Sequence, residues 1–236
     1  MELDRSETER MDIKIHSLLT GAEQAMGSVA IIDVLRAFTT AAVAIANGAS
    51  QITMVSAVEE ALRLRALGVG QVCMGEVGGQ APPGFDFGNS PSEIKKVDFT
   101  GKSIIQRTSA GTQGIVAACR AKHLYATSLV TARSLRSKSP DRVTLVAMGK
   151  NAVERTDEDE LCALHLRNLL EGRPGDPDAV RRLILAGAEA ERFRSRILPH
   201  LYPDDLDIAL DIDRYDFALK IQLEDNRPVA RSERTE

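Results

Sequence analysis

Short apolar segments recur along the chain and alternate with longer stretches in which the apolar residues follow helical spacing. Several of these segments are apolar at every position, as expected for strands that are covered on both faces of a sheet. The pattern predicts six strands, at residues 28–33, 51–55, 71–74, 103–108, 123–126 and 142–147.

Stretches with helical spacing fill the intervals between the predicted strands. They predict helices at residues 36–46, 57–67, 112–121 and 130–137. Strands and helices that alternate in this way form an α/β fold with a largely parallel sheet and right-handed crossovers. We therefore expect a three-layer arrangement with helices on both faces of the sheet.

The pattern changes after Gly149. A stripe of apolar residues predicts a helix over residues 158–170, and the segment GRPGDP at residues 172–177 is a turn by composition. A second helix, rich in arginine, is predicted over residues 178–197. We expect its arginines to form a solvated face.

This change of pattern divides the chain into two expected lobes, an N-terminal α/β lobe over residues 11–135 and a C-terminal α/β lobe over residues 136–222. Residues 1–10 are polar and lack the apolar stretch of a signal peptide, so we expect a disordered tail. We expect a second, frayed tail over residues 223–236.

Composition and charge narrow the classes of function. The net charge is −4 and the isoelectric point about 5.7, which argues against a general nucleic-acid binder. No apolar run approaches the roughly 18 residues of a membrane-spanning helix, so we expect no membrane association. The three cysteines show no paired spacing, which favours reduced thiols and a cytoplasmic protein.

Asp33 and Arg36 occupy the turn between a predicted strand and the helix that follows it. In open α/β sheets, ligands bind at the carboxyl ends of strands. Asp33 could bind a metal ion there, and the rigid guanidinium of Arg36 could hold a phosphate or a carboxylate. An aspartate that caps the helix and pairs with Arg36 would explain the same pattern without any function.

Glu76 stands where another predicted strand enters a long loop rich in glycine and proline, residues 78–91. Loops of this length tend to be either functional or disordered. Two phenylalanines within the loop favour an ordered one. Glu76 is therefore a candidate catalytic residue and metal ligand.

Asn89 and Ser90 end this loop and begin another helix. Ser90 and Glu93 have the spacing of a capping box, and Pro91 stands at the first helical position. Capping alone explains these residues, yet the N-terminus of a helix also suits an anion. Asn89 and Ser90 are therefore candidate substrate-binding residues.

Residues 107–112 lead from a predicted strand into a helix. Hydroxyl groups and a glycine in such a turn can surround an anion with backbone amides. Ordinary helix capping is the structural alternative. The candidate substrate-binding residues in this turn are Arg107, Thr108, Ser109, Gly111 and Thr112, with Lys150 farther along the chain.

Four consecutive acids, residues 157–160, begin the helix predicted over residues 158–170. The helix dipole favours acids in a first turn, but four acids exceed this need. Mg²⁺ is a hard cation that binds carboxylates and water. Glu158 and Asp159 are therefore candidate metal ligands.

Other phosphate-handling motifs fit poorly. Residues 100–103 resemble the end of a P-loop, but they precede a predicted strand and lack the upstream glycine. No cysteine is followed six positions later by an arginine, which excludes the motif of the cysteine phosphatases. The four histidines have no metal-ligand spacing, which argues against a structural zinc site.

Five segments occur in a fixed order along the chain. They are DVLRA at residues 33–37, GE at 75–76, GFDFGNSP at 84–91, TSAGT at 108–112 and EDELCA at 158–163. Their order and composition resemble those of the 2-phosphosulfolactate phosphatase family. The resemblance covers about residues 13–221, and GFDFGNSP is its most specific part.

The resemblance implies a two-lobed α/β fold, a requirement for Mg²⁺ and hydrolysis of the phosphate from 2-phospho-3-sulfolactate. In organisms that make coenzyme M, this step belongs to coenzyme M biosynthesis. Members also occur where that pathway is not expected, so a similar small anionic 2-hydroxy acid phosphate is a second expected substrate. The chain departs from the usual family pattern at Val77, where an arginine is common, and around Lys150.

Our hypothesis is a metal-assisted displacement at phosphorus, with Asp33, Arg36 and Glu76 as the catalytic residues. One Mg²⁺ would be held by Asp33, Glu76, Glu158 and Asp159. Arg36 and the amides near Ser90 and Gly111 would neutralise the equatorial phosphoryl oxygens. A covalent aspartyl phosphate at Asp33 is the alternative chemistry.

A catalytically silent anion-binding protein on the same scaffold is the alternative function. The small molecule bound would be an anionic phosphate ester in either case. The alanine-rich helix predicted over residues 36–46 suggests close packing within or between subunits, so a homodimer is one expected arrangement.

Overall fold

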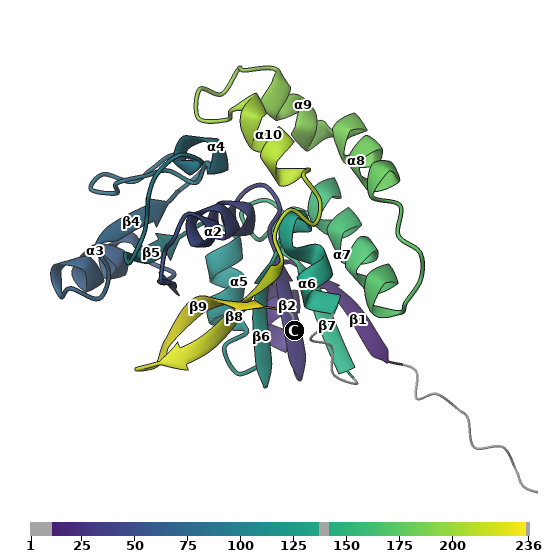
Figure 1. Ribbon diagram of the computed structural model, residues 1–236, viewed down its shortest axis with the longest axis horizontal. Helices are drawn as coiled ribbons and strands as arrows, with labels where there is room; N and C mark the ends of the chain where they lie inside the picture. Colours follow the sequence, from purple (N-terminus) through teal and green to yellow (C-terminus); the bar gives the residue numbers. More distant parts are fainter. Residues whose placement is uncertain (1–10, 137–141, 235–236) are drawn as a thin grey trace, which may run out of the picture.

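The computed structural model describes residues 11–136 and 142–234, and its strands form one nine-stranded sheet in the order β1-β7-β2-β6-β8-β9-β3-β5-β4 (Figure 1). All six predicted strands are confirmed. The tail predicted at residues 1–10 lies outside the described residues. The strands are β1 (Asp12–Ser17), β2 (Ser28–Ile32), β3 (Gln51–Met54), β4 (Val72–Gly75), β5 (Ser103–Arg107), β6 (His123–Thr127), β7 (Arg142–Ala147), β8 (Phe217–Glu224) and β9 (Arg227–Arg234).

The sheet consists of two parallel blocks that are joined by an antiparallel hairpin. β1, β7, β2 and β6 pair in parallel, and so do β3, β5 and β4. Between these blocks, β8 pairs with β6 and β9 pairs with β3, both antiparallel. Because β7 lies between β1 and β2, segments from both sides of the predicted boundary at residue 135 share one block, and the two lobes are not confirmed.

Helices surround this sheet. They are α1 (Leu18–Gln24), α2 (Ala37–Ala46), α3 (Val58–Ala66), α4 (Pro91–Ile94), α5 (Gly111–Ala117), the 3-10 helix η1 (Leu129–Thr131), α6 (Ala132–Arg136), α7 (Asp157–Leu170), α8 (Pro177–Ala186), α9 (Ala188–Arg194) and α10 (Pro203–Ala209). The helix predicted over residues 178–197 is wrong as a single helix, because Gly187 adopts an extended conformation and separates α8 from α9. Within the described chain, no helix has both the length and the apolar character needed to span a bilayer.

The helices cover both faces of the sheet, as predicted. Side chains alternate between the faces of a strand. In β2, Val29 and Ile31 pack with α1, α2 and α5, whereas Ala30 and Ile32 pack with α6 and α7. α3 packs against the block of β3, β5 and β4. The α/β, three-layer fold class is therefore confirmed.

The alanine-rich helix α2 is buried within the chain from Ala37 to Ile45. Its small side chains allow close packing against the sheet and the neighbouring helices. This packing accounts for the composition that suggested a subunit contact. The homodimer stays a prediction.

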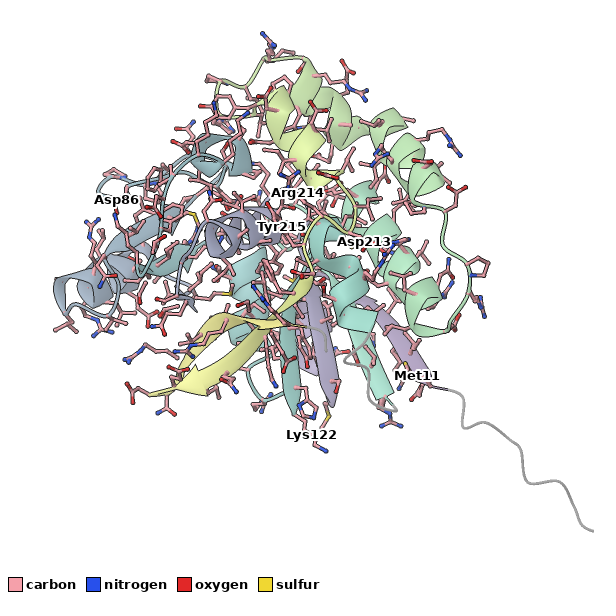
Figure 2. All side chains as sticks on the ribbon, viewed as in Figure 1. Met11, Asp86, Lys122, Asp213, Arg214 and Tyr215 are labelled. Atoms are coloured by element: carbon pink, nitrogen blue, oxygen red, sulfur yellow. The ribbon has the colours of Figure 1, made fainter. Side chains whose placement is uncertain are left out.

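A hairpin occupies the region where we predicted a frayed tail over residues 223–236, and that prediction is wrong for the described residues. Asp225 and Asn226 have φ values of 48° and 60°, as in the two-residue turn whose twist matches that of the flanking strands. The chain enters β8 past Tyr215, which is labelled in Figure 2, and the Tyr215 ring stacks on Phe217 with centroids 5.4 Å apart. The hairpin therefore completes the sheet between the two parallel blocks.

Residues 177–209, which contain α8, α9 and α10, form what we call the cap segment. In Figure 1, α9 and α10 lie at the top of the molecule, and α8 lies at the upper right, next to α7. α10 contacts both α4 and α9. This placement brings the cap segment over the turns that follow the strands.

Candidate functional site

A cavity of about 130 Å³ opens where β2, β4, β5 and β7 end. Residues that follow these strands line it, together with the start of α7 and part of the cap segment. Its charged lining consists of Asp33, Arg36, Glu76, Lys150, Glu158, Glu189 and Arg192. Turns that are far apart in the sequence therefore meet at one site, at the carboxyl ends of strands, as open α/β sheets favour.

Asp33 directly follows β2 and is buried. Its Oδ1 atom accepts a hydrogen bond from the amide of Ala37 at 2.9 Å, and its Oδ2 atom accepts one from the amide of Gly111 at 2.8 Å. Burial is the main cause that raises the pKa of Asp33 to about 6, and the nearby charge of Glu76 contributes to this increase. Asp33 thus holds the starts of α2 and α5 together while it lines the cavity.

Two acids of α7 lie near Asp33. Asp159 accepts hydrogen bonds from the amides of Val34 and Gly149, both at 2.8 Å, and does not line the cavity. Burial and the charges of Glu158 and Asp33 raise the pKa of Asp159 well above its usual range. Glu158 does line the cavity, and its buried Oε2 atom has no hydrogen-bond partner among the described residues.

Burial also raises the pKa of Glu158, to about 7, and the charges of Glu189 and Asp33 contribute to the increase. The carboxylates of Asp33, Glu158 and Asp159 therefore share one poorly solvated region. A positive charge placed there would be strongly favoured.

Glu76 holds two loops in place. Its Oε1 atom accepts a hydrogen bond from the amide of Ser109 at 2.5 Å, and its Oε2 atom accepts one from the amide of Gly79 at 2.6 Å. The Ser109 hydroxyl donates to the same Oε2 atom at 3.1 Å. Glu76 lines the cavity, but both of its carboxylate oxygens accept hydrogen bonds from the loops that follow β4 and β5.

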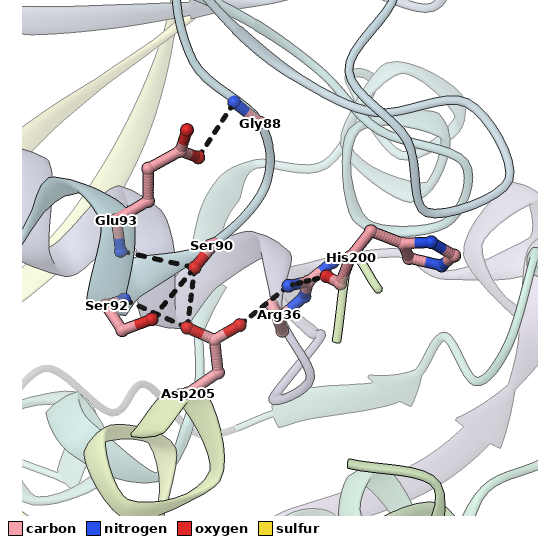
Figure 3. Close-up of polar contacts among 7 residues, drawn as sticks. All are labelled: Arg36, Gly88, Ser90, Ser92, Glu93, His200 and Asp205. Carbon is pink, nitrogen blue, oxygen red and sulfur yellow. Dashed lines mark hydrogen bonds and ion pairs between the residues drawn. The ribbon is translucent and has the colours of Figure 1, made fainter. Parts of the chain in front are cut away.

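Arg36 is buried against the cap segment (Figure 3). Its Nη1 atom donates to Asp205 Oδ2 at 2.6 Å and to the backbone carbonyl of His200 at 2.9 Å. The guanidinium also lies over the Phe193 ring, 5.6 Å from its centroid. Arg36 therefore pairs with Asp205 and not with Asp33, which overturns the pairing expected from capping alone.

Asn89 and Ser90 lie differently with respect to the cavity. Asn89 lines the cavity, and its buried Oδ1 atom has no partner among the described residues. The Ser90 hydroxyl caps α4 by accepting from the Glu93 amide at 3.2 Å, and it donates to Asp205 Oδ1 at 2.7 Å. Ser90 therefore supports the site from outside the cavity.

Within residues 107–112, the cavity is lined only by Ser109 and Ala110. Arg107 Nη1 donates to the carbonyl of Glu76 at 2.7 Å and so supports the loop after β4. The hydroxyl groups of Thr108 and Thr112 engage each other's backbone amides.

The amides near Ser90 and Gly111 were predicted to bind an anion, but they already have internal acceptors. The amide of Gly111 donates to Asp33 and that of Ser92 donates to Asp205. The positively charged side chains that line the cavity are therefore better candidates than these amides for binding an anion.

Lys150 lines the cavity in the segment that follows β7. Its Nζ atom lies 3.7 Å from Glu154 Oε2, and its side chain is partly exposed. The preceding Gly149 has a φ of +62°, and a Cβ atom there would lie 2.1 Å from the Glu154 carbonyl oxygen. Gly149 thus permits the turn in which its amide donates to Asp159 and Lys150 lines the cavity.

Comparison with known proteins decides the family. The model of the 2-phosphosulpholactate phosphatase family matches residues 15–221. This chain belongs to that family. A probable 2-phosphosulfolactate phosphatase of Bacillus subtilis is 30% identical over 206 residues, which cover 84% of this chain and 88% of the relative. The match to a protein of the same description from Thermotoga petrophila is 36% identical but covers 62% of this chain and 64% of the relative.

A third relative with this description, from Carboxydothermus hydrogenoformans, is 43% identical over 108 residues, or 46% of this chain and 44% of the relative.

Among the described residues of this family member, the structure adds lining residues that no sequence motif indicated. They are Glu189, Arg192, Phe193, His200 and Leu201 of the cap segment. Helical spacing alone does not reveal which face of α9 meets the site, so its arginines were expected to be solvated.

Arg192 and His200 are the chemically most relevant of these additions. Arg192 donates to Glu189 at 2.5 Å, and both side chains line the cavity. The buried Nδ1 atom of His200 has no partner among the described residues. Burial lowers the pKa of His200, and the charges of Arg36 and Arg192 lower it further.

The donor set suits a hydrated hard cation. Among the described residues, no three side chains of His, Cys, Asp or Glu are arranged as a ready ligand group. Mg²⁺ commonly binds through one or two carboxylates and several waters, so a complete protein cage is not required. Asp33 and Glu158 are the residues that could hold it, because both line the cavity and the Glu158 Oε2 atom has no partner.

Proposed function

We propose that this family member is a Mg²⁺-dependent phosphatase that hydrolyses 2-phospho-3-sulfolactate or a similar small anionic 2-hydroxy acid phosphate. The observation that carries the proposal is the meeting of buried carboxylates and arginines at one cavity. Asp33 and Glu158 supply the acids, and Arg36 and Arg192 supply the cations.

The size of the cavity supports a small substrate. Its volume of about 130 Å³ lies well below the roughly 300–1,000 Å³ of sites for drug-sized ligands. The acids in its lining would repel an anionic ester on their own. A bound divalent cation would reverse that repulsion, which supports the requirement for Mg²⁺.

Different residues of this chain would bind the metal and the substrate. Asp33 and Glu158 would hold Mg²⁺, which when bound polarises a phosphoryl oxygen and lowers the pKa of a bound water. Arg36 would hold the phosphoryl group, because its guanidinium lines the cavity and is fixed by the cap segment. Arg192 and Lys150 would hold the acidic groups of the substrate.

Attack by water is favoured over a covalent aspartyl phosphate. Both oxygens of Asp33 accept hydrogen bonds from backbone amides, which lowers the nucleophilicity of the carboxylate. A phospho-enzyme trapped with labelled substrate and lost in Asp33→Asn would contradict this preference.

The activity is tested with 2-phospho-3-sulfolactate, phosphoglycolate and phospholactate, each with MgCl₂ and with EDTA. We expect phosphate release that requires Mg²⁺, with the highest kcat/KM for 2-phospho-3-sulfolactate. A different order of kcat/KM would change the substrate but not the reaction. If Mg²⁺ supports no release from any of these esters or from p-nitrophenyl phosphate, the catalytically silent alternative is correct.

We further propose that the protein works in a reducing, cytoplasmic compartment. Cys73, Cys119 and Cys162 are all free thiols, and cytosolic proteins keep their cysteines reduced. Fractionation of cells that express the tagged chain tests this location. Recovery with an extracytoplasmic fraction would contradict it.

A further inference from the structure

Asp205 of the cap segment joins two parts of the molecule. Its side chain is fully buried. One oxygen, Oδ2, accepts from Arg36 Nη1 at 2.6 Å, while the other, Oδ1, accepts from the Ser90 hydroxyl at 2.7 Å and from the Ser92 amide at 2.9 Å (Figure 3). Asp205 therefore ties the turn after β2 to the start of α4.

This arrangement leaves part of the Arg36 guanidinium free for a ligand. The Nη1 atom is taken by Asp205 and by the carbonyl of His200. The Nε and Nη2 atoms have no hydrogen-bond acceptor among the described residues, and Arg36 lines the cavity. Because the guanidinium is planar and rigid, fixing one nitrogen also fixes the direction of the others.

A buried ion pair is costly unless further hydrogen bonds satisfy it. Asp205 receives such bonds from Ser90 and Ser92, and Arg36 receives packing from the Phe193 ring. The pair is therefore supported on both sides. This is the arrangement expected where the orientation of an arginine matters more than its contribution to stability.

We propose that Asp205 is a positioning residue, which aims the free nitrogens of Arg36 into the cavity so that they bind the phosphoryl group. The proposal rests on the proposed function, because it assigns to Arg36 the phosphoryl group of the substrate. It adds that the cap segment acts on the substrate through Arg36, without Asp205 contacting the substrate itself.

Binding of inorganic phosphate, measured by calorimetry on the full chain with MgCl₂, tests this proposal. Asp205→Asn keeps the shape but has one acceptor oxygen, so it cannot serve both Arg36 and the Ser92 amide. We expect its Kd for phosphate to rise about tenfold. Asp204→Asn is the matched control, because Asp204 neighbours Asp205 on α10 and pairs at the surface with Lys95, the residue after α4.

The control should bind phosphate within about twofold of the wild type, since a surface ion pair contributes little. A double-mutant cycle separates positioning from a direct effect. In the Arg36→Met background, Asp205→Asn should change the Kd by less than about twofold. A loss that persists in this background, or a wild-type Kd for Asp205→Asn, would overturn the proposal.

Arg36→Lys covers the case in which Asp205→Asn does not fold. It keeps the charge beside Asp205 but replaces the fork with a single nitrogen, which Asp205 and the His200 carbonyl would occupy. We expect a loss of phosphate binding as large as that of Arg36→Met. Wild-type affinity in Arg36→Lys would overturn the proposal, and so would a wild-type chain that binds no phosphate.

Turnover distinguishes this proposal from the proposed function. In Asp205→Asn, KM for the best ester should rise about tenfold while the pH dependence of kcat stays that of the wild type. Absence of turnover in the wild type would contradict the proposed function. The ratios of phosphate Kd values would still decide the role of Asp205.

Discussion

Asp159 on α7 accepts a 2.8 Å hydrogen bond from the backbone amide of Val34, the second residue after β2. This bond fixes the start of α7 against the turn that carries Asp33. As a result Glu158, the residue before Asp159, joins Asp33 in the lining of the cavity. The acids that begin α7 thus belong to the same site as the turn after β2.

Stability without metal should rise as the pH falls. The pKa values of Asp33 and Glu158 are raised to about 6 and about 7, from 3.8 and 4.5. At a pH between the lower pKa values of the unfolded state and the raised pKa values of the folded state, the folded state binds more protons than the unfolded state. The free energy of unfolding therefore increases as the pH falls from about 8 to about 5. Urea denaturation in EDTA across this range measures the slope.

Glu158→Gln provides the control for this pH dependence. Its slope should be smaller than that of the wild type, because one of the two titrating groups is gone. Equal slopes in the two proteins would contradict the assignment of the titration to Glu158.

Removal of the Glu158 charge should increase the free energy of unfolding and decrease turnover. Glu158→Gln relieves repulsion from Asp33 and Glu189, so without metal we expect a gain of about 1 kcal/mol in the free energy of unfolding. Turnover should fall by about 100-fold or more, since a metal ligand is lost. Glu59→Gln, an exposed change of the same type on α3, should alter neither quantity. A variant of Glu158 that keeps wild-type turnover would rule out this role.

Glu76→Gln should weaken the anion site more than the metal site. The amide group has one acceptor oxygen for the Ser109 and Gly79 amides, so one of these partly buried donors loses its partner at a cost of about 1 kcal/mol. We expect the Kd for phosphate to rise several times more than the Kd for Mg²⁺. Calorimetry with each ligand measures both, and an effect confined to Mg²⁺ would show that Glu76 is mainly a metal ligand.

Gly149→Ala should disrupt the turn after β7. Its Cβ atom would meet the Glu154 carbonyl at 2.1 Å, and the residue has a positive φ. We expect a loss of about 3 kcal/mol or more in the free energy of unfolding, together with loss of turnover. Gly172→Ala is the matched control, with a φ of +68° and no atom within 4 Å of the added Cβ. It should cost only about 1 kcal/mol. Similar losses in both variants would contradict the argument from steric contact.

The sequence predicted the parts of the fold that depend on local pattern. The apolar runs predicted six strands, and the acids and hydroxyls at their ends indicated Asp33, Glu76 and Ser109. The run of acids at the start of the helix after them indicated Glu158, and all four of these residues line the cavity. The hairpin of β8 and β9 was missed because the turn Asp225-Asn226 is a weaker signal than Asn-Gly and its pairing partners are distant in sequence.

The cap segment shows what local pattern cannot reveal. Asp205 follows Pro203 and Asp204 and reads as an ordinary acid in the first turn of a helix. Arg192 reads as one member of a solvated face. The long-range contacts with Arg36, Ser90 and Ser92 distinguish Asp205 from Asp204, and no spacing within α10 encodes them.

Titration of MgCl₂ into the metal-free protein at pH 8, followed by calorimetry, tests the central claim most directly. The account predicts binding of one Mg²⁺ that is weakened at least about tenfold in Asp33→Asn and in Glu158→Gln, but is unchanged in Glu59→Gln. A wild-type protein that binds no Mg²⁺, or wild-type affinity in both site variants, would contradict it.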